Sequence, residues 1–345
     1  MNVISRMHLE ALATDVLTAV GVPQDDARLA ADCLVYANRS GVDSHGVVRL
    51  AHYVRRLSNG TIKARPQIKM VQVRSGILRV HGDDGLGHVI TTRAVDRGLE
   101  IAAEHGSVAI SISDSSHFGM AGFYLRDITN AGMVGMVTTH TDALIVPPGA
   151  TVPFSGTNPI AFGFPSGGDP VVLDFATSSV AYGKIALAQA EGQSIPDHWG
   201  LGANGEPTTD PNDFAGMHPI AGHKGAGLAM IIDLFSAMFS GMPAATHVNR
   251  MYIDLDAPRK LGHFISIWDI GALHPIAEVQ DRIADYREEL HNLPRRPGVS
   301  RLFAPGEPEA VRREERDRDG IPIAPGLAAE LRELARSLGV DARGL

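Results

Sequence analysis

The stretch 107–124, SVAISISDSSHFGMAGFY, places one histidine at the point where a strand-like pattern ends. Bulky and small residues alternate along 108–113, which is the period of a strand with one apolar face. Apolar residues then recur at helical spacing as far as Gly132, so His117 stands where a strand passes into a helix. An imidazole there can take or give a proton near neutral pH, because its ordinary pKa is about 6.5. The alternative is that His117 only caps the start of the helix.

A second group of candidate functional residues lies within 43–60, DSHGVVRLAHYVRRLSNG. The pattern predicts one helix, which Asp43 or Ser44 caps and Gly60 ends. Its apolar face carries Val47, Leu50, Val54 and Leu57, and the opposite face carries His45, Arg49, His52 and Arg56, with Tyr53 beside it. The N–H groups at a helix start favour an anion, and Arg49, one turn on, could hold a carboxylate bidentately. The alternative is an ordinary solvated basic face.

Two glycine-rich turns approach phosphate-binding patterns without completing them. Residues 77–113 read as strand, glycine turn, helix and strand, but Ile90 replaces the third glycine of G-x-G-x-x-G, and no acidic residue ends the second strand at the usual distance of about 20 positions. The turn GHKG at 222–225 lacks the Lys-Ser/Thr pair of a P-loop. The sequence therefore argues against a Rossmann domain, while Lys224 at a helix start still suits a phosphate or a carboxylate. The alternative for Lys224 is a surface lysine.

Several other segments end in polar residues or lack a period. A strand that begins near Met133 runs into a polar end at 139–142, and residues 171–173 read as a buried strand that ends at Asp174. Residues 195–211 have no helical period and read as a long loop, a kind of segment that often has a functional role. The C-terminal helix has an apolar stripe that we expect to pack on the amino-terminal helices. This stripe consists of Leu327, Leu331, Leu334 and Leu338.

The composition of the whole chain argues against several classes of protein. The 345 residues have a formal net charge of -8 and no long block of lysine and arginine, so nucleic acid is not an expected partner. Cys33 is the only cysteine, which excludes disulfides and fits a reducing compartment. Neither H-E-x-x-H nor G-x-S-x-G occurs, and we predict no metal site. Residues 1–12 do not read as a signal peptide, and no apolar run approaches the ~20 residues of a membrane helix, so a cytoplasmic protein is expected.

Seven segments, taken together, resemble the type-2 malate/L-lactate dehydrogenase family of NAD(P)-dependent oxidoreductases. They lie in family order between about residue 5 and about residue 310: SGVDSHGVVRL, ISDSSHFGMAG, SGTNPIAFGFP, LDFATSSVAYGKI, IPDHW, PTTDP and GHKGAGLAM. Within the family, MYIDLDAPRKLG and TDALIVPPG resemble the ureidoglycolate branch, whereas SSHFG resembles the malate and sulfolactate enzymes. The resemblance implies hydride transfer between a nicotinamide cofactor and a small 2-hydroxy acid. Ureidoglycolate or a close analogue is the expected substrate, and malate, L-lactate and sulfolactate are the alternatives.

The resemblance also implies a fold and an assembly. It implies an α/β protein in which a three-layer cofactor domain, built on a mixed sheet of about seven strands and not on a Rossmann fold, lies beside a small helical domain. The helical, substrate-side domain would comprise residues 1–74 packed with the tail 309–345, and the NAD(P)-binding domain would comprise residues 75–308. A homodimer is expected. NAD is the expected cofactor, with NADP as the alternative.

The family's functional positions can be matched to this sequence one by one. His117 corresponds to the catalytic acid/base, although some members assign the proton transfer to the position of His45. Ser44, Arg49 and Tyr53 match the substrate-side motif. The positions that match cofactor contacts are Thr141, Asp174, Phe175, Ala176, Lys224, Gly306, Glu307 and Pro308. In the implied reaction a neutral His117 takes the hydroxyl proton while Arg49 holds the carboxylate.

Overall fold

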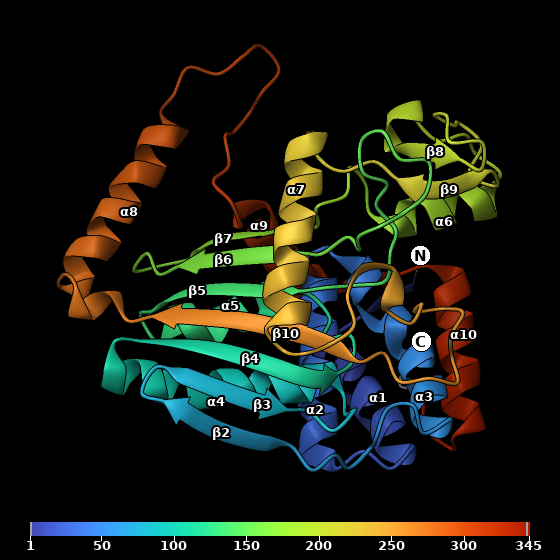
Figure 1. Cartoon of the computed structure of the whole chain (residues 1–345), viewed down its shortest axis with the longest axis horizontal. Helices are drawn as coiled ribbons and strands as arrows, with labels where there is room; N and C mark the ends of the chain where they lie inside the picture. Colours follow the sequence, from blue (N-terminus) through green and yellow to red (C-terminus); the bar gives the residue numbers. More distant parts are fainter. Residues whose placement is uncertain (1, 343) are drawn as a thin grey trace.

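A seven-stranded sheet runs through the larger part of the molecule (Figure 1). The structure is a computed structural model that describes residues 2–342 and 344–345. From one edge to the other the strands are β2 (Lys69–Arg74), β3 (Ile77–His81), β4 (Ser107–Ser115), β10 (Leu261–Trp268), β5 (Val134–Thr139), β6 (Ile160–Phe164) and β7 (Val171–Phe175). β3 and β4 are parallel, and the other neighbouring pairs in this sheet are antiparallel. The sheet is therefore mixed, which confirms the predicted α/β class with about seven strands.

The period-two pattern that contains His117 forms the central strand β4. Val108, Ile110 and Ile112 are buried on one face. That face is covered by α4 (Gly87–His105), which makes the crossover between the parallel strands β3 and β4, and by α5 (Gly122–Asn130). The strand ends at Ser115, so His117 lies in the short connection between β4 and α5, as the sequence predicts.

The opposite face of the sheet is covered over its centre by one long helix. This helix begins as α7 (His223–Asp233) and continues as the π-helical turn η4 (Leu234–Met238). The rings of Phe235 and Phe239 contact Phe264 of β10, and α7 crosses in front of the strands in Figure 1. Toward its edges this face carries exposed apolar residues.

A second core lies among the terminal helices. It joins α1 (Arg6–Ala19), α2 (Gln24–Arg39), α3 (Leu50–Ser58) and α10 (Pro325–Ser337), together with the short pair β1 (Asn2–Ile4) and β11 (Ile321–Ile323). Leu331 of the C-terminal stripe is fully buried, and Leu327, Leu334 and Leu338 pack against the same core. The predicted packing of this stripe on the amino-terminal helices is confirmed. The helix α9 (Glu307–Asp319) leads into this region and also contacts α2.

The single helix predicted over 43–60 does not form. The chain instead makes two 3-10 turns, η1 (Asp43–His45) and η2 (Val47–Arg49), and the α-helix α3 begins only at Leu50. The break lies at Gly46, whose backbone is extended at φ -87° and ψ -152°. Gly46 packs so closely on Asn38 that a Cβ would lie 2.2 Å from its Oδ1 atom, and this same atom accepts the Val47 N–H at 2.9 Å. A side chain of α2 therefore caps this segment.

The alternative of a solvated basic face is wrong for Arg56. Its side chain is buried and donates hydrogen bonds to the carbonyl oxygens of Met251, Asp254 and Ala257. The guanidinium thus fastens α3 to the connection that precedes β10. Burial lowers the pKa of Arg56 to about 10, so it remains charged at neutral pH.

Two further segments differ from the sequence expectations. β7, predicted as a buried strand, is the edge of the sheet, and Leu173 is 42 % exposed. Residues 195–211, predicted as a loop, contain β8 (Gly200–Gly202), which pairs with β9 (Phe214–Met217) beside α6 (Tyr182–Glu191). Regular structure there comes from pairing with residues outside the segment. In the described part of the chain, no helix is long and apolar enough to cross a membrane.

Candidate active site

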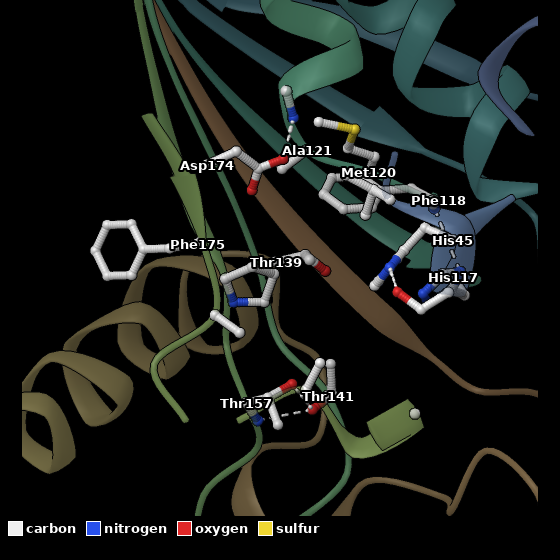
Figure 2. Close-up of a pocket in the computed structure, with 18 of the residues that line it drawn as sticks. His45, His117, Phe118, Met120, Ala121, Thr139, Thr141, Thr157, Asp174 and Phe175 are labelled. Carbon is white, nitrogen blue, oxygen red and sulfur yellow. Dashed lines mark hydrogen bonds between the residues drawn. The ribbon is translucent and has the colours of Figure 1, made fainter. Parts of the chain in front are cut away.

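A cavity of about 970 Å³ lies where the sheet meets the terminal helices. Its walls come from the connection after β4, from the ends of β5 and β7, and from the turn 303–306 that precedes α9. Figure 2 shows Asp174 and Phe175 on one side of this space and His45 and His117 on the other. Polar strand ends that are distant in sequence therefore open onto one shared volume, as expected for a ligand site in an α/β protein.

His117 lines the cavity, and its Nδ1 atom forms a hydrogen bond with a tyrosine hydroxyl. The Tyr53 hydroxyl lies 2.7 Å from Nδ1 of His117, and the Gly119 backbone nitrogen lies 3.3 Å from the same atom. Tyr53 is buried and does not itself line the cavity. Burial, and then the positive charge of Arg49, keeps the pKa of His117 well below its ordinary value. His117 is therefore neutral at pH 7 and can accept a proton.

His45 stands beside His117. The two rings are stacked with their centroids 5.6 Å apart, and Nδ1 of His45 is 3.0 Å from the Ser44 hydroxyl. Burial, with a further contribution from Arg49, lowers the pKa of His45 to about 4. Both imidazoles are neutral, and both line the cavity. Both histidines are therefore candidates for the proton-transfer residue.

Arg49 supplies an unneutralised positive charge next to the two histidines. Its Nε donates to the Ser44 carbonyl oxygen at 2.7 Å, and its Nη1 lies 3.7 Å from Sδ of Met251. The guanidinium also faces the ring of Tyr252, with 5.6 Å from Cζ to the centroid. Within the described residues it has no carboxylate partner, although it lines the cavity. A fixed guanidinium with a free edge is suited to a ligand carboxylate.

Arg259 is a further cavity residue that the sequence reasoning missed. Its side chain is 2 % exposed, and Nη2 donates to Oδ1 of Asp142 at 2.7 Å. The Nε and Nη1 atoms are buried without a hydrogen-bond partner among the described residues. Unpaired buried donors are costly, which makes them candidates for ligand contacts. In the sequence, Arg259 lies within a turn-like stretch, DAPRKLG, with no periodicity to distinguish it from a surface arginine.

Six of the eight matched cofactor positions line the cavity. They are Thr141, Asp174, Phe175, Ala176, Gly306 and Pro308. Oδ2 of Asp174 accepts the Gly122 N–H at 2.7 Å, and burial raises the pKa of this carboxyl to about 6. Gly306 has a φ of +90°, and a Cβ there would lie 3.0 Å from the Val172 nitrogen. Glycine is required at this turn because the backbone is left-handed and the strand β7 is so close.

The two other matched positions, Lys224 and Glu307, do not line the cavity. Lys224 is exposed at the first turn of α7. Glu307 is buried and accepts hydrogen bonds from Arg287 and His291 of α8 (Ile276–His291). Their predicted contacts with a cofactor stay predictions. Among residues 2–342 and 344–345, no group of three or more His, Cys, Asp and Glu side chains could hold a metal ion.

Comparisons with known proteins identify the family of this chain. A family model for malate/L-lactate dehydrogenase matches residues 4–332. The malate dehydrogenase of Pyrococcus abyssi is 33% identical over 347 aligned residues, which are 98% of this chain and 95% of that protein. The ureidoglycolate dehydrogenase (NAD(+)) of Escherichia coli strain K12 is 31% identical over 321 residues, 93% of this chain and 92% of that protein. The sulfolactate dehydrogenase from Methanocaldococcus jannaschii has the same fold at a TM-score of 0.91 and 31% identity, with 99% of this chain and 98% of that one covered. Because the family match spans nearly the whole chain and the resemblance at His117 and Arg49 falls in one cavity, this protein belongs to the malate/L-lactate dehydrogenase family.

Proposed function

We propose that the protein is a nicotinamide-dependent dehydrogenase of small 2-hydroxy acids. The observation that carries the proposal is the pairing of a neutral, buried His117 with the unneutralised guanidinium of Arg49 in one cavity. Arg49 binds the substrate carboxylate, and His117 takes the proton of the neighbouring hydroxyl during oxidation. For Nε2 to take this proton, Nδ1 must carry the ring hydrogen and donate it to the Tyr53 hydroxyl oxygen, 2.7 Å away, both before and after the transfer.

The cavity residues fit a nicotinamide dinucleotide. The volume is in the range of cofactor sites, and Oδ1 of Asp174, on the cavity wall, has no hydrogen-bond partner among the described residues, as suits a ribose hydroxyl. The cavity-lining turn at Gly306 and the polar end of β5 at Thr141 would hold the rest of the molecule. When bound, the cofactor supplies the hydride acceptor. NAD is the proposed form and NADP the alternative, and the E. coli relative is named as an NAD(+) enzyme.

We infer that the cofactor does not bind in the Rossmann manner. The Gly85–Gly87 turn is packed under the histidine connection, because a Cβ on Gly87 would lie 2.3 Å from the Ser116 carbonyl oxygen. Neither Gly85 nor Gly87 lines the cavity. These observations support a non-Rossmann cofactor domain over residues 75–308. The helical core of the terminal segments likewise supports a small substrate-side domain of 1–74 packed with 309–345.

The substrate we propose carries a second group that accepts hydrogen bonds. The support is Arg259, whose buried Nε and Nη1 lack protein partners in the same cavity as Arg49. The ureido carbonyl of ureidoglycolate, the second carboxylate of malate and the sulfonate of sulfolactate can each accept from these donors, whereas the methyl group of lactate cannot. A bound ligand that leaves them unpaired loses about 1–3 kcal/mol. Because Arg259 suits all three acids, lactate is placed last; we propose ureidoglycolate on the resemblance of MYIDLDAPRKLG and TDALIVPPG to that branch, with malate and sulfolactate as the alternatives.

A substrate panel tests this proposal. The rate of nicotinamide reduction is measured with ureidoglycolate, malate, sulfolactate and lactate, each with NAD and with NADP. The proposed order predicts the highest kcat/KM for ureidoglycolate. A value for malate or sulfolactate at least ~10-fold higher would replace ureidoglycolate within the same reaction class, since ~1.4 kcal/mol of transition-state binding corresponds to tenfold. No reduction with any of the four acids would contradict the proposed function.

Replacing Arg259 by lysine should remove the preference for a second polar group. Lysine keeps a positive charge beside Asp142 but cannot supply the separate Nε and Nη1 donors. We expect kcat/KM for the preferred acid to fall at least ~10-fold and that for lactate to change much less. Arg250→Lys is the matched control, because Arg250 also lines the cavity but is paired with Asp254. An equal loss for all four acids would remove Arg259 from substrate selection.

We further propose that the protein is a homodimer whose contact uses the face of the sheet that bears α7. Exposed apolar side chains gather there on the helix, at Ile231, Leu234, Met238 and Phe239, and on the strands, at Phe164 and Trp268. A monomeric protein rarely exposes so many neighbouring apolar side chains. A second copy of the chain is the proposed partner, because a large apolar patch on a compact subunit is typical of homodimer contacts.

The homodimer is tested by placing a charged side chain on this apolar face. Sedimentation of the parent protein should give twice the mass of one chain, and Leu234→Glu should shift the equilibrium to single chains, because a buried unpaired carboxylate is strongly disfavoured at an apolar contact. Met7→Glu is the control, since Met7 is 74 % exposed on α1, in the terminal-helix region. A parent protein that sediments as one chain at all concentrations would contradict the proposal.

A further inference from the structure

Glu307 is held by three hydrogen-bond donors on the side of its turn that faces away from the cavity. Oε1 accepts from Nη2 of Arg287 at 2.7 Å, and Oε2 accepts from Nε2 of His291 and from the Ala304 N–H, each at 2.8 Å. The carboxylate is 5 % exposed. Burial by itself raises the pKa of Glu307, but the hydrogen bonds outweigh it and lower the pKa to about 2. Glu307 is therefore an anion at neutral pH with its hydrogen bonds made inside the protein.

These bonds fix one wall of the cavity. Phe303, Ala304, Pro305 and Gly306 line the cavity directly. The turn that they form is tied to Glu307 through the Ala304 N–H and to strand β7 through the bond from the Val172 N–H to the Pro305 carbonyl, at 3.1 Å. The position of the turn thus depends on a carboxylate that does not itself reach the cavity.

Arg287 connects a second part of the same wall. Besides Glu307, its Nη1 donates to the Asp169 carbonyl at 2.7 Å and lies 3.1 Å from the Ser166 hydroxyl. Asp169 lines the cavity next to β7. One guanidinium therefore holds both the segment before β7 and the turn before α9.

The helix that contains Arg287 and His291 makes little other packing contact with the rest of the protein. None of the described residues of α8 is buried, and Figure 1 shows this helix standing apart from the sheet beside a long connection. The helix has an apolar stripe that packs on none of the three cores formed by the described residues, and this stripe consists of Ile276, Val279, Ile283, Tyr286 and Leu290. The hydrogen bonds of Arg287 and His291 to Glu307 are thus a main link between α8 and the cavity wall.

We propose that Glu307 is a positioning residue for the cofactor, and that it acts through the clamp formed by Glu307, Arg287 and His291. The clamp sets the distance between the turn 303–306 and the edge of β7, and so the width of the cavity at that wall. The proposal rests on the proposed function for the identity of the ligand. It assigns to Glu307 a role different from the direct cofactor contact that the family resemblance implies.

The variant Glu307→Gln tests the clamp. Glutamine has the same size and can still accept from the Ala304 N–H, but it loses the charge-assisted bonds to Arg287 and His291. The Kd of NAD or NADP, measured by nicotinamide fluorescence, should rise at least ~10-fold, while kcat at saturating cofactor stays within about twofold. Arg287→Ala should raise the Kd at least as much, because it also removes the bonds to Asp169 and Ser166, and the double variant should be no worse than Arg287→Ala alone. Glu288→Gln, an exposed glutamate on α8, is the control and should leave the Kd unchanged.

Amide hydrogen exchange gives a readout that does not depend on the reaction. The amides of Ala304 and Val172 should exchange faster in Glu307→Gln than in the parent, since both donate within the clamped wall. If the parent binds no nicotinamide cofactor, the proposed function fails, and the exchange rates still decide whether the clamp holds the wall. Equal exchange in the two proteins, an unchanged cofactor Kd, or a loss confined to kcat would overturn the positioning role.

Discussion

Replacing His117 by alanine is expected to lower kcat for oxidation of the 2-hydroxy acid by at least ~10²-fold, with the Kd of the cofactor within about twofold of the parent value. The removed group is the neutral base, and positioned general bases contribute roughly 10²- to 10⁴-fold. The cofactor residues lie on the other side of the cavity, so their contacts should persist. Steady-state rates at saturating substrate and fluorescence titration of the cofactor measure the two quantities separately.

The comparison with His45→Ala decides which histidine transfers the proton. Both rings are neutral and stacked, and each has a hydroxyl at Nδ1, but the Tyr53 hydroxyl lies nearer to His117, at 2.7 Å, than the Ser44 hydroxyl to His45, at 3.0 Å, and can better stabilise the charge that forms on the ring. We therefore expect His45→Ala to lower kcat less than His117→Ala, and Tyr53→Phe to lower kcat with a smaller change in KM. A greater loss of kcat in His45→Ala would reverse the roles of the two histidines.

Replacing Arg49 by lysine is expected to raise KM for the 2-hydroxy acid at least ~10-fold. A carboxylate gains two parallel bonds from a guanidinium and one point contact from an ammonium, and charge-assisted bonds of this kind contribute about 1.5–3 kcal/mol each. Lysine would also lose the bond from Nε to the Ser44 carbonyl that now fixes the side chain. Initial rates over a range of acid concentrations, at saturating cofactor, give the KM.

Arg55→Lys is the matched control for Arg49→Lys. Arg55 lies on the same helix region but is exposed and does not line the cavity, so its replacement should leave KM unchanged. If Arg49→Lys also leaves KM unchanged, the substrate carboxylate is bound elsewhere, and Arg259 becomes the first candidate because its Nε and Nη1 are unpaired.

The local sequence pattern was sufficient for the elements that carry the proposed base. The alternation along 108–112 predicts β4, and the helical spacing after it predicts α5, so the place of His117 between them follows from the chain itself. Periodicity succeeds here because one face of each element is buried against a single partner surface. The order of short motifs was likewise sufficient to predict the family, because each motif can be recognised from its own residues without knowledge of the fold. The family model confirms this prediction.

The same kind of reasoning failed over 43–60, where the periodicity is compatible with one helix. The helix is interrupted because Gly46 packs on Asn38 of another helix, and Asn38 takes the place of the predicted caps Asp43 and Ser44 for the Val47 N–H. Arg56 is buried because its partners are carbonyl groups about 200 residues further along the chain. Neither contact can be predicted from the local hydrophobic periodicity.

The positions of Arg259 and Glu307 relative to the cavity could not be predicted from the sequence. Each is a charged residue in an irregular segment, and from the sequence each could equally lie on the surface, in the cavity or behind it. Tertiary structure buries both: Arg259 faces the cavity with two unpaired donors, whereas Glu307 faces away from it and is fully bonded to α8 and Ala304. A buried charge must find its partners wherever the fold brings them, and those partners lie at separations that no residue period encodes.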